Sequence, residues 1–284
     1  MVVATGFFDG VHLGHRLVIK ALVDEARARG EESLVLTFWP HPRTVLQNGA
    51  RALRLLTSLE EKKALLKSLG VDRIEVLEFT REFSAMSTED YLCMLRDRYS
   101  ASAIVLGYDN RMGRNAGSTD SIAASAEALG LDVIRTSALS LNPSSTVSST
   151  AIRCALEEGR VADAADMLGY RYALKGVVVG GRQVGRTIGF PTANLRLYDP
   201  LKLVPAVGVY FVEVETLNGH YWGMCNVADR IETHIFDFSE HIYGLDLKVS
   251  FVCRVRDEIQ FKSLDLLKQQ LQLDREACRA LIPE

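Results

Sequence analysis

Residues 6–15 read GFFDGVHLGH. They follow an apolar run at 2–5 and precede a segment, 14–29, in which apolar residues recur with helical spacing. Glycines in such a turn let the backbone come close to a ligand, and the helix N-terminus presents free amides to an anion. His12 and His15 are three residues apart, so their imidazoles face one side if the helix has begun. The stretch therefore predicts a phosphate-binding turn.

The sequence around this turn alternates strand-like and helix-like segments. We expect strands at 2–5, 33–38, 74–79, 103–107 and 133–137, and helices at 14–29, 58–67, 88–99 and 118–129. Repeated strand-helix-strand units favour a parallel sheet with helices on its faces. The first expected domain is therefore an α/β domain, residues 1–168, which ends with a helical segment at 151–168.

The pattern changes near residue 170. Closely spaced strands are expected at 173–179, 208–216, 221–227, 231–238 and 247–255, followed by an amphipathic helix at 263–281. Gly, Asn and Asp separate these strands, a pattern typical of an antiparallel barrel. The second expected domain is a β-barrel, residues 169–284, that ends in a helix.

Composition narrows the class of protein. The 284 residues are 48% hydrophobic and 24% charged, with a formal net charge of −3, which is typical of a globular protein and argues against nucleic acid or an anionic membrane as a partner. The five cysteines are scattered and form no Cys-x-x-Cys pair, which argues against a disulfide framework or a zinc site. We see no signal-peptide pattern and no apolar run of about 18 residues, so the expected location is the cytoplasm.

A second motif lies at the start of the expected barrel. Residues 180–195 read GGRQVGRTIGFPTANL. Four glycines and two arginines suit a loop that wraps around phosphates. Thr192 and Asn194 point to the same side of an extended segment, and their neutral oxygens suit Mg²⁺ that is also bound to phosphate. No Gly-Lys-Ser/Thr follows, so this is not a Walker loop.

Several stretches together resemble the bacterial bifunctional riboflavin kinase/FMN adenylyltransferase (FAD synthetase) family. GFFDGVHLGH is similar to the His-x-Gly-His signature of its adenylyltransferase half, and SSTAIR at 148–153 resembles its Ser-Ser-Thr-x-x-Arg motif. TFWPHPR at 37–43 and GYDNRMGR at 107–114 resemble two further family runs, with Met112 where Phe is usual. The resemblance implies a Rossmann-like nucleotidylyltransferase domain.

The second half resembles riboflavin kinase. Residues 180–195 are similar to that enzyme's Gly-Arg-x-x-Gly-Phe-Pro-Thr-Ala-Asn signature, and ETHIFDF at 232–238 resembles its catalytic strand. The family usually has a longer loop between Asn226 and Glu232, so either that loop is absent in this protein or the sequence lacks a segment. A true deletion would impair the kinase.

The resemblance implies roles for individual residues. For adenylyl transfer it implies catalysis by His12, His15 and Arg153, nucleotide binding by Gly6, Phe7, Asp9, Gly10, Gly14, Ser149 and Thr150, and flavin binding by Pro40, His41, Gly107, Asp109 and Arg111. For the kinase it implies nucleotide binding by Gly185, Arg186, Gly189 and Pro191, Mg²⁺ at Thr192 and Asn194, and Glu232 as general base.

The expected reactions are phosphorylation of riboflavin by ATP and adenylylation of FMN by a second ATP. Flavins are then substrates and products, not a prosthetic group, and Mg²⁺ accompanies ATP. The chain is expected to be a monomer or a weak homo-oligomer. The alternatives are an enzyme with one of the two sites impaired, a His-x-Gly-His transferase for another substrate, and a flavin-binding regulator without turnover.

Overall fold

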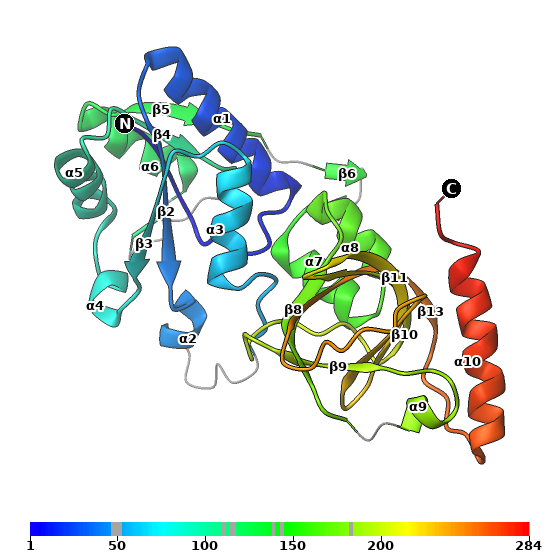
Figure 1. The fold of residues 1–284 in the computed structure, drawn as a ribbon. Coiled ribbons are helices and arrows are strands. Elements are labelled where there is room, and N and C mark those ends of the chain that lie inside the picture. Colours follow the sequence, from blue (N-terminus) through cyan, green and yellow to red (C-terminus); the bar gives the residue numbers. More distant parts are fainter. Residues whose placement is uncertain are drawn as a thin grey trace. The chain divides into compact units, whose positions relative to one another are not determined.

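The structure is a computed structural model that describes residues 1–46, 53–108, 112–113, 118–137, 140–142, 145–181 and 184–283 (Figure 1). The chain forms two compact units, Met1–Ser149 and Thr150–Glu284. None of the helices within these described ranges is both long and apolar enough to cross a bilayer.

The first unit is built on a five-stranded parallel sheet in the order β3-β2-β1-β4-β5. Its strands are β1 (Val2–Thr5), β2 (Ser33–Trp39), β3 (Arg73–Glu78), β4 (Ala103–Leu106) and β5 (Asp132–Arg135). The first strand is central and the chain winds outward on both sides, which is the doubly wound order of Rossmann-like folds. The predicted α/β fold of this half is confirmed.

Helices cover both faces of this sheet. The helices are α1 (Leu13–Arg29), α2 (Pro42–Leu46), α3 (Leu59–Ser68), α4 (Arg81–Ser84), α5 (Thr88–Tyr99) and α6 (Thr119–Ala128), and a short ribbon of β6 (Ser140–Asn142) and β7 (Ser145–Thr146) follows β5. On one face, Ile19 of α1 and Leu66 of α3 pack with Val35. On the other face, α5 and α6 pack against Val3 and Ile104.

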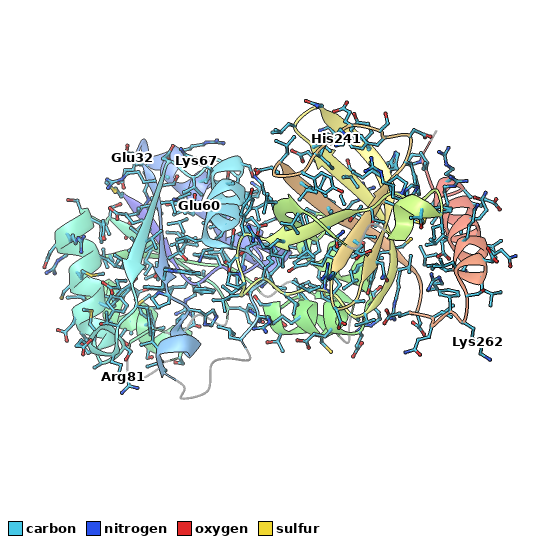
Figure 2. The ribbon with its side chains drawn as sticks, turned by 60° about the horizontal axis from the view of Figure 1, so that its bottom comes forward. Glu32, Glu60, Lys67, Arg81, His241 and Lys262 are labelled. Atoms are coloured by element: carbon cyan, nitrogen blue, oxygen red, sulfur yellow. The ribbon has the colours of Figure 1, made fainter. Side chains whose placement is uncertain are left out.

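The helix α3 begins at a capping box. The Ser58 hydroxyl accepts from the Glu61 amide, and the Glu61 carboxylate accepts from the Ser58 amide. Glu60 and Lys67 lie on the exposed side of this helix (Figure 2), whereas Lys62 and Leu66 are buried. One side of α3 therefore faces the sheet.

Two helices, α7 (Ser149–Glu157) and α8 (Val161–Leu168), form where we expected one helical segment. By contacts they belong with the barrel, whereas our expected boundary was residue 168. The Ala206 amide donates to the Leu156 carbonyl at 2.9 Å, and Gly159 lies against the Tyr210 side chain. Amphipathic spacing shows that a helix has a packing face, but not which domain covers that face.

The second unit is a closed six-stranded antiparallel barrel in the order β10-β11-β12-β9-β8-β13. Its elements are β8 (Ala173–Val179), α9 (Val184–Thr187), β9 (Ala193–Leu197), β10 (Gly208–Thr216), β11 (Gly219–Val227), β12 (Ile231–Ile235), β13 (Asp246–Arg256) and α10 (Leu264–Arg279). The predicted barrel with a C-terminal helix is confirmed. The strand β9 was not expected as a separate strand, and β12 ends before Asp237, whose φ is 53°.

The helix α10 packs on the barrel through an apolar cluster and a buried ion pair. Cys278 and Leu271 pack with Phe211 of β10. Arg256, at the end of β13, donates from Nε and Nη2 to the Asp274 carboxylate at 2.7–3.0 Å. Asp274 is only 2% exposed, so this pair joins α10 to the barrel away from water.

Candidate functional sites in the two units

The turn between β1 and α1 brings the two motif histidines together. His12 is the N-cap of α1, and its Nδ1 accepts a hydrogen bond from the His15 amide at 3.3 Å. The two rings stack with centroids 3.6 Å apart and planes 17° apart. Both imidazoles therefore lie on one side of the helix start, next to its free amides.

His15 is neutral at neutral pH. Burial, followed by the neighbouring His12 and the charge of Lys62, holds the pKa of His15 well below its usual 6.5. A neutral imidazole carries one N–H donor and one acceptor. His15 can therefore donate a hydrogen bond to a phosphate oxygen without carrying a charge of its own.

Asp9 links the turn to the segment that precedes α3. Its buried carboxylate accepts from the Leu56 amide at 3.0 Å and from the Thr57 amide at 3.1 Å. The Thr57 hydroxyl accepts from the Gly10 amide at 3.1 Å, and the Ser149 hydroxyl donates to the Asp9 carbonyl at 3.0 Å. The Asp9 carboxylate is therefore hydrogen-bonded to backbone amides just before α3.

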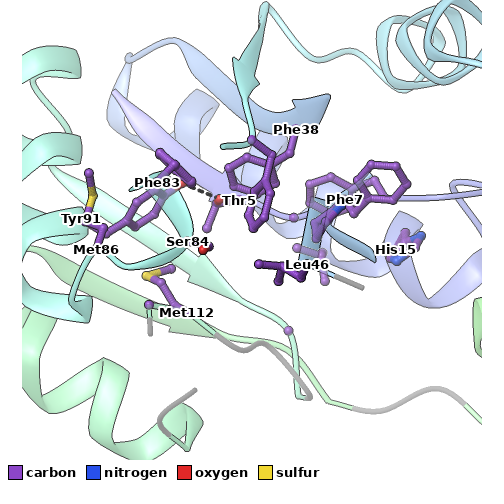
Figure 3. A pocket seen from close by; sticks show the side chains of 17 residues that line it. Thr5, Phe7, His15, Phe38, Leu46, Phe83, Ser84, Met86, Tyr91 and Met112 are labelled. Atoms are coloured by element: carbon purple, nitrogen blue, oxygen red, sulfur yellow. Dashed lines mark hydrogen bonds between the residues drawn. The ribbon is translucent and has the colours of Figure 1, made fainter. Parts of the chain in front are cut away.

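A cavity of about 620 Å³ opens beside the turn, and its walls are largely apolar and include several aromatic rings (Figure 3). Phe7 and His15 lie at one end and Tyr91 at the other, where the Tyr91 hydroxyl lies 2.6 Å from Thr5 Oγ1. Other apolar lining residues are Phe8, Val18, Phe38, Pro42, Leu46, Phe79, Phe83, Met86 and Met112. A flat aromatic ligand can fill such a space while a phosphate group meets His15.

Of the other predicted residues of this site, some line the cavity or contact its lining, others lie in α1, α7 or after β2, and two are outside the described residues. Gly107 lines the cavity, and the His41 ring contacts the Phe7 ring edge-on at 4.0 Å between centroids. Pro40 follows β2, and Thr150 and Arg153 lie in α7. Gly6 lines the cavity and Gly14 lies in the first turn of α1. Asp109 and Arg111 lie outside the described residues.

The aromatic wall was missed by our sequence analysis. Phe38, Phe79 and Phe83 come from β2, the segment after β3, and α4. Their rings form a mutual cluster with centroids 5.5–5.8 Å apart. Nothing in these separate segments indicates that the rings meet, because the cluster depends on the pairing of β2 with β3 and on the packing of α4 after β3.

The barrel carries two smaller cavities that share Thr192. One, of about 350 Å³, is lined by Arg186, Pro191 and His241 as well as Thr192. The other, of about 280 Å³, is lined by Thr192, Glu232 and residues of other elements, including Gly185, Arg256, Phe261, Leu267 and Leu271. The glycine-rich motif and the predicted general base therefore meet at Thr192.

Asn194 lies next to Glu232 in the barrel wall. The two residues are register partners in the β9–β12 ladder, so their side chains share a face. Asn194 is 6% exposed, and its Oδ1 has no hydrogen-bond partner in the described part of the chain. A buried carbonyl oxygen without a donor is suited to a cation.

At two glycine positions of the motif, neighbouring atoms leave no room for a side chain. A Cβ at Gly181 would lie 2.2 Å from Asn194 Nδ2, and one at Gly185 would lie 2.2 Å from the Phe190 carbonyl oxygen. Gly189 has a φ of 86° and follows α9. The glycines therefore let the loop fold against Asn194 and the strand that follows it.

The link between β11 and β12 is short. Only residues 228–230 separate the strands, and the Ala228 amide donates to the Arg230 carbonyl at 3.0 Å. The short segment after Asn226 is therefore a tight hairpin turn in this chain.

Comparisons with known proteins assign the family. The family model for FAD synthetase matches residues 1–151, and the model for riboflavin kinase matches residues 168–282. The bifunctional riboflavin kinase/FMN adenylyltransferase of Listeria monocytogenes is 36% identical, covering 98% of this chain and 91% of that protein. The chain belongs to this family. The Escherichia coli member is 33% identical over 98% of this chain and 91% of its own length.

A solved structure agrees over the whole length. A protein from Streptococcus pneumoniae, described as a macrolide-efflux protein, superposes with a TM-score of 0.91 at 32% identity, covering 98% of this chain and 93% of that one. The family predicted from the motifs and the two-domain fold are confirmed.

Proposed function

We propose that this chain makes both flavin nucleotides, with adenylyl transfer carried out by residues 1–168 and riboflavin phosphorylation by residues 169–284. The family assignment confirms the predicted pair of enzyme activities, riboflavin kinase and FMN adenylyltransferase. The observation that carries the proposal for the first unit is that His15 and the aromatic wall line one cavity. A phosphate-binding turn and a space for a flat ring system are what FMN requires.

In adenylyl transfer, an oxygen of the FMN phosphate attacks the α-phosphorus of ATP. A bond forms between that oxygen and phosphorus, the bond to the β-phosphate oxygen breaks, and pyrophosphate leaves. His12, His15 and the amides at the start of α1 donate hydrogen bonds to the phosphate oxygens. From the motif resemblance alone, we also assign Arg153, Ser149 and Thr150 to this reaction. Because no covalent intermediate is required, position and electrostatics provide the catalysis.

In the barrel, we assign ATP to the cavity lined by Arg186 and riboflavin to the one lined by Glu232. Thr192 lines both cavities, so the γ-phosphate of ATP would be transferred at this residue. Glu232 accepts the proton of the ribityl hydroxyl as its oxygen attacks the γ-phosphorus, and ADP leaves.

The barrel residues fit a magnesium ion bound with ATP. Thr192 and Asn194 would hold it, and the unpartnered buried Oδ1 of Asn194 supports this assignment. In the described ranges no group of three or more His, Cys, Asp and Glu residues is suited to a metal, so phosphate oxygens would complete its ligands. When bound, Mg²⁺ neutralises charge on the transferred phosphate.

The remaining assignments are also proposals. We place the chain in the cytoplasm because all five cysteines are free thiols. We also propose that it is a monomer or a weak homo-oligomer. We keep residues 1–168 and 169–284 as the catalytic domains, since the motif at 148–153 is assigned to adenylyl transfer. A second candidate is an adenylyltransferase with an impaired kinase, and the tight turn at 228–230 favours it.

A product time course tests the function. The purified chain is incubated with riboflavin, ATP and Mg²⁺, and riboflavin, FMN and FAD are separated by chromatography. We expect FMN and then FAD from the wild type, FMN alone from His15→Ala, and no FMN from Glu232→Gln, which still converts added FMN to FAD. Matched controls are His220→Ala and Glu215→Gln, both exposed in the barrel.

The outcomes separate the candidates. FAD made from FMN but no FMN made from riboflavin identifies the second candidate. If neither product forms, the chain is not this enzyme, and flavin binding without turnover takes the place of both.

A further inference from the structure

A buried lysine contacts the phosphate-binding turn through Phe7. Lys62 is 1% exposed. Its Nζ donates to the Phe7 carbonyl oxygen and to Thr37 Oγ1, both at 2.9 Å, and lies 4.0 Å from the centre of the Phe7 ring. Taking an ammonium out of water is costly, and its two hydrogen-bond partners are neutral. The net burial cost is reflected in the lowered pKa of Lys62, although the nearby Asp9 carboxylate favours its charged form.

The surroundings of Lys62 connect it to the candidate site. Phe7 follows β1 and Thr37 lies near the end of β2, so the ammonium lies at the carboxyl edge of the sheet, where ligands bind in open α/β folds. Phe7 also lines the aromatic cavity together with His15. Lys62 thus contacts a residue of the turn that also lines the cavity.

We propose that Lys62 is a positioning residue for adenylyl transfer, which holds the Phe7 carbonyl and places a positive charge next to the turn that binds the triphosphate of ATP. The inference rests on the proposed function of the first unit. Lys62 acts through Phe7 and the paired histidines, and it does not touch the substrate. Its charge offsets the negative charge that builds up on the phosphates during transfer.

The charge of Lys62 is sensitive to pH. Burial lowers the pKa of Lys62 to about 8, although the carboxylate of Asp9 opposes this shift. The titratable groups that face it are Asp9 and His15, with His12 stacked behind His15, and Thr37 on the β2 side does not titrate. The charged form is present below this pKa and is lost as the pH rises through it.

A structural role and a positioning role predict different results for Lys62→Met. Methionine has a similar length, and the Thr37 hydroxyl still donates to the Phe7 carbonyl at 3.2 Å, so these oxygens keep a partner. Replacing a buried charge by an apolar side chain is often neutral or stabilising. A positioning role therefore predicts lost activity with an unchanged or higher Tm.

The experiment measures FAD formation from FMN, ATP and Mg²⁺ with the full chain between pH 6.5 and 9.5. We expect kcat/KM of the wild type to fall above about pH 8. Lys62→Met should be on the order of a hundredfold slower at pH 7 and lack this fall. Lys62→Arg keeps its charge and should restore much of the rate without the fall. Lys67→Met, an exposed lysine of the same helix, is the matched control.

The riboflavin kinase rate of each variant serves as an internal control and should change by less than about twofold. The inference is overturned if Lys62→Met keeps the wild-type rate and pH profile. It is also overturned if Lys62→Met and Lys62→Arg both lose activity together with a lowered Tm. A wild type that makes no FAD from FMN overturns the proposed function itself, whereas normal FAD formation by Lys62→Met overturns only the role of Lys62.

Discussion

Glu232 lies directly opposite Asn194 in the β9–β12 ladder of the barrel. Because the pairing puts the two side chains on one face, the proposed general base is a neighbour of the proposed metal ligand. The barrel thereby brings together two motifs that are separate in the sequence.

Replacing Asn194 should weaken metal use by the kinase. Asn194→Ala removes the buried Oδ1 and one proposed oxygen ligand of Mg²⁺. We expect the Mg²⁺ concentration for half-maximal FMN formation to rise at least on the order of tenfold, because even groups that only support a metal ligand contribute that much to metal affinity. A Mg²⁺ titration of the kinase rate measures this. An unchanged titration curve would remove Asn194 from the metal site.

The two neighbouring glycines offer a matched pair of variants. A Cβ at Gly181 would lie 2.2 Å from Asn194 Nδ2, whereas a Cβ at Gly180 would meet nothing within 4 Å. Gly181→Ala should therefore displace the Asn194 side chain and slow FMN formation about tenfold or more, while Gly180→Ala stays close to the wild type. Initial rates of both variants at saturating ATP make the comparison. Equal rates would show that the Asn194 position does not limit the kinase.

His15 should make the first unit sensitive to acid. The pKa of His15 is well below 6.5 in the folded chain, so below pH 6.5 the unfolded chain binds a proton that the folded chain does not. Stability is therefore lost as the pH falls, by up to about 2 kcal/mol at pH 5. Urea unfolding at pH 7.5 and pH 5 should show a smaller loss for His15→Gln than for the wild type. His220→Gln, exposed in the barrel, should lose as much as the wild type.

The buried ion pair at α10 should support riboflavin binding. Asp274→Asn leaves the Arg256 guanidinium without its carboxylate, which costs about 3–5 kcal/mol for a buried pair. Leu267 and Leu271 of α10 line the proposed riboflavin cavity, so we expect a raised KM for riboflavin. Steady-state kinetics of FMN formation measure it. Asp265→Asn, exposed in the first turn of α10, should leave KM unchanged, as should the adenylyl-transfer rate of either variant.

The sequence alone was sufficient to predict those features that depend on residues close together in the chain. The helix expected at 88–99 is α5 with the same bounds, since its Ser87 cap directly precedes the segment and its apolar spacing lies within it. The strand-helix alternation predicted the parallel sheet, and the spacing of His12 and His15 predicted that they face one side. The family motifs pointed to both activities before any fold was known.

The features that could not be predicted from the sequence depend on contacts between segments that are distant in the chain. The rings of Phe38, Phe79 and Phe83 meet because β2 pairs with β3 and α4 packs next to them. The helices α7 and α8 pack with the barrel, which could not be predicted because helical periodicity does not show which domain covers the apolar face of a helix. Lys62 shows the same limit: its helical segment was evident from the sequence, but its burial next to Phe7 depends on how α3 packs on the sheet. Periodicity describes one segment at a time, whereas burial and cavity walls arise from long-range packing.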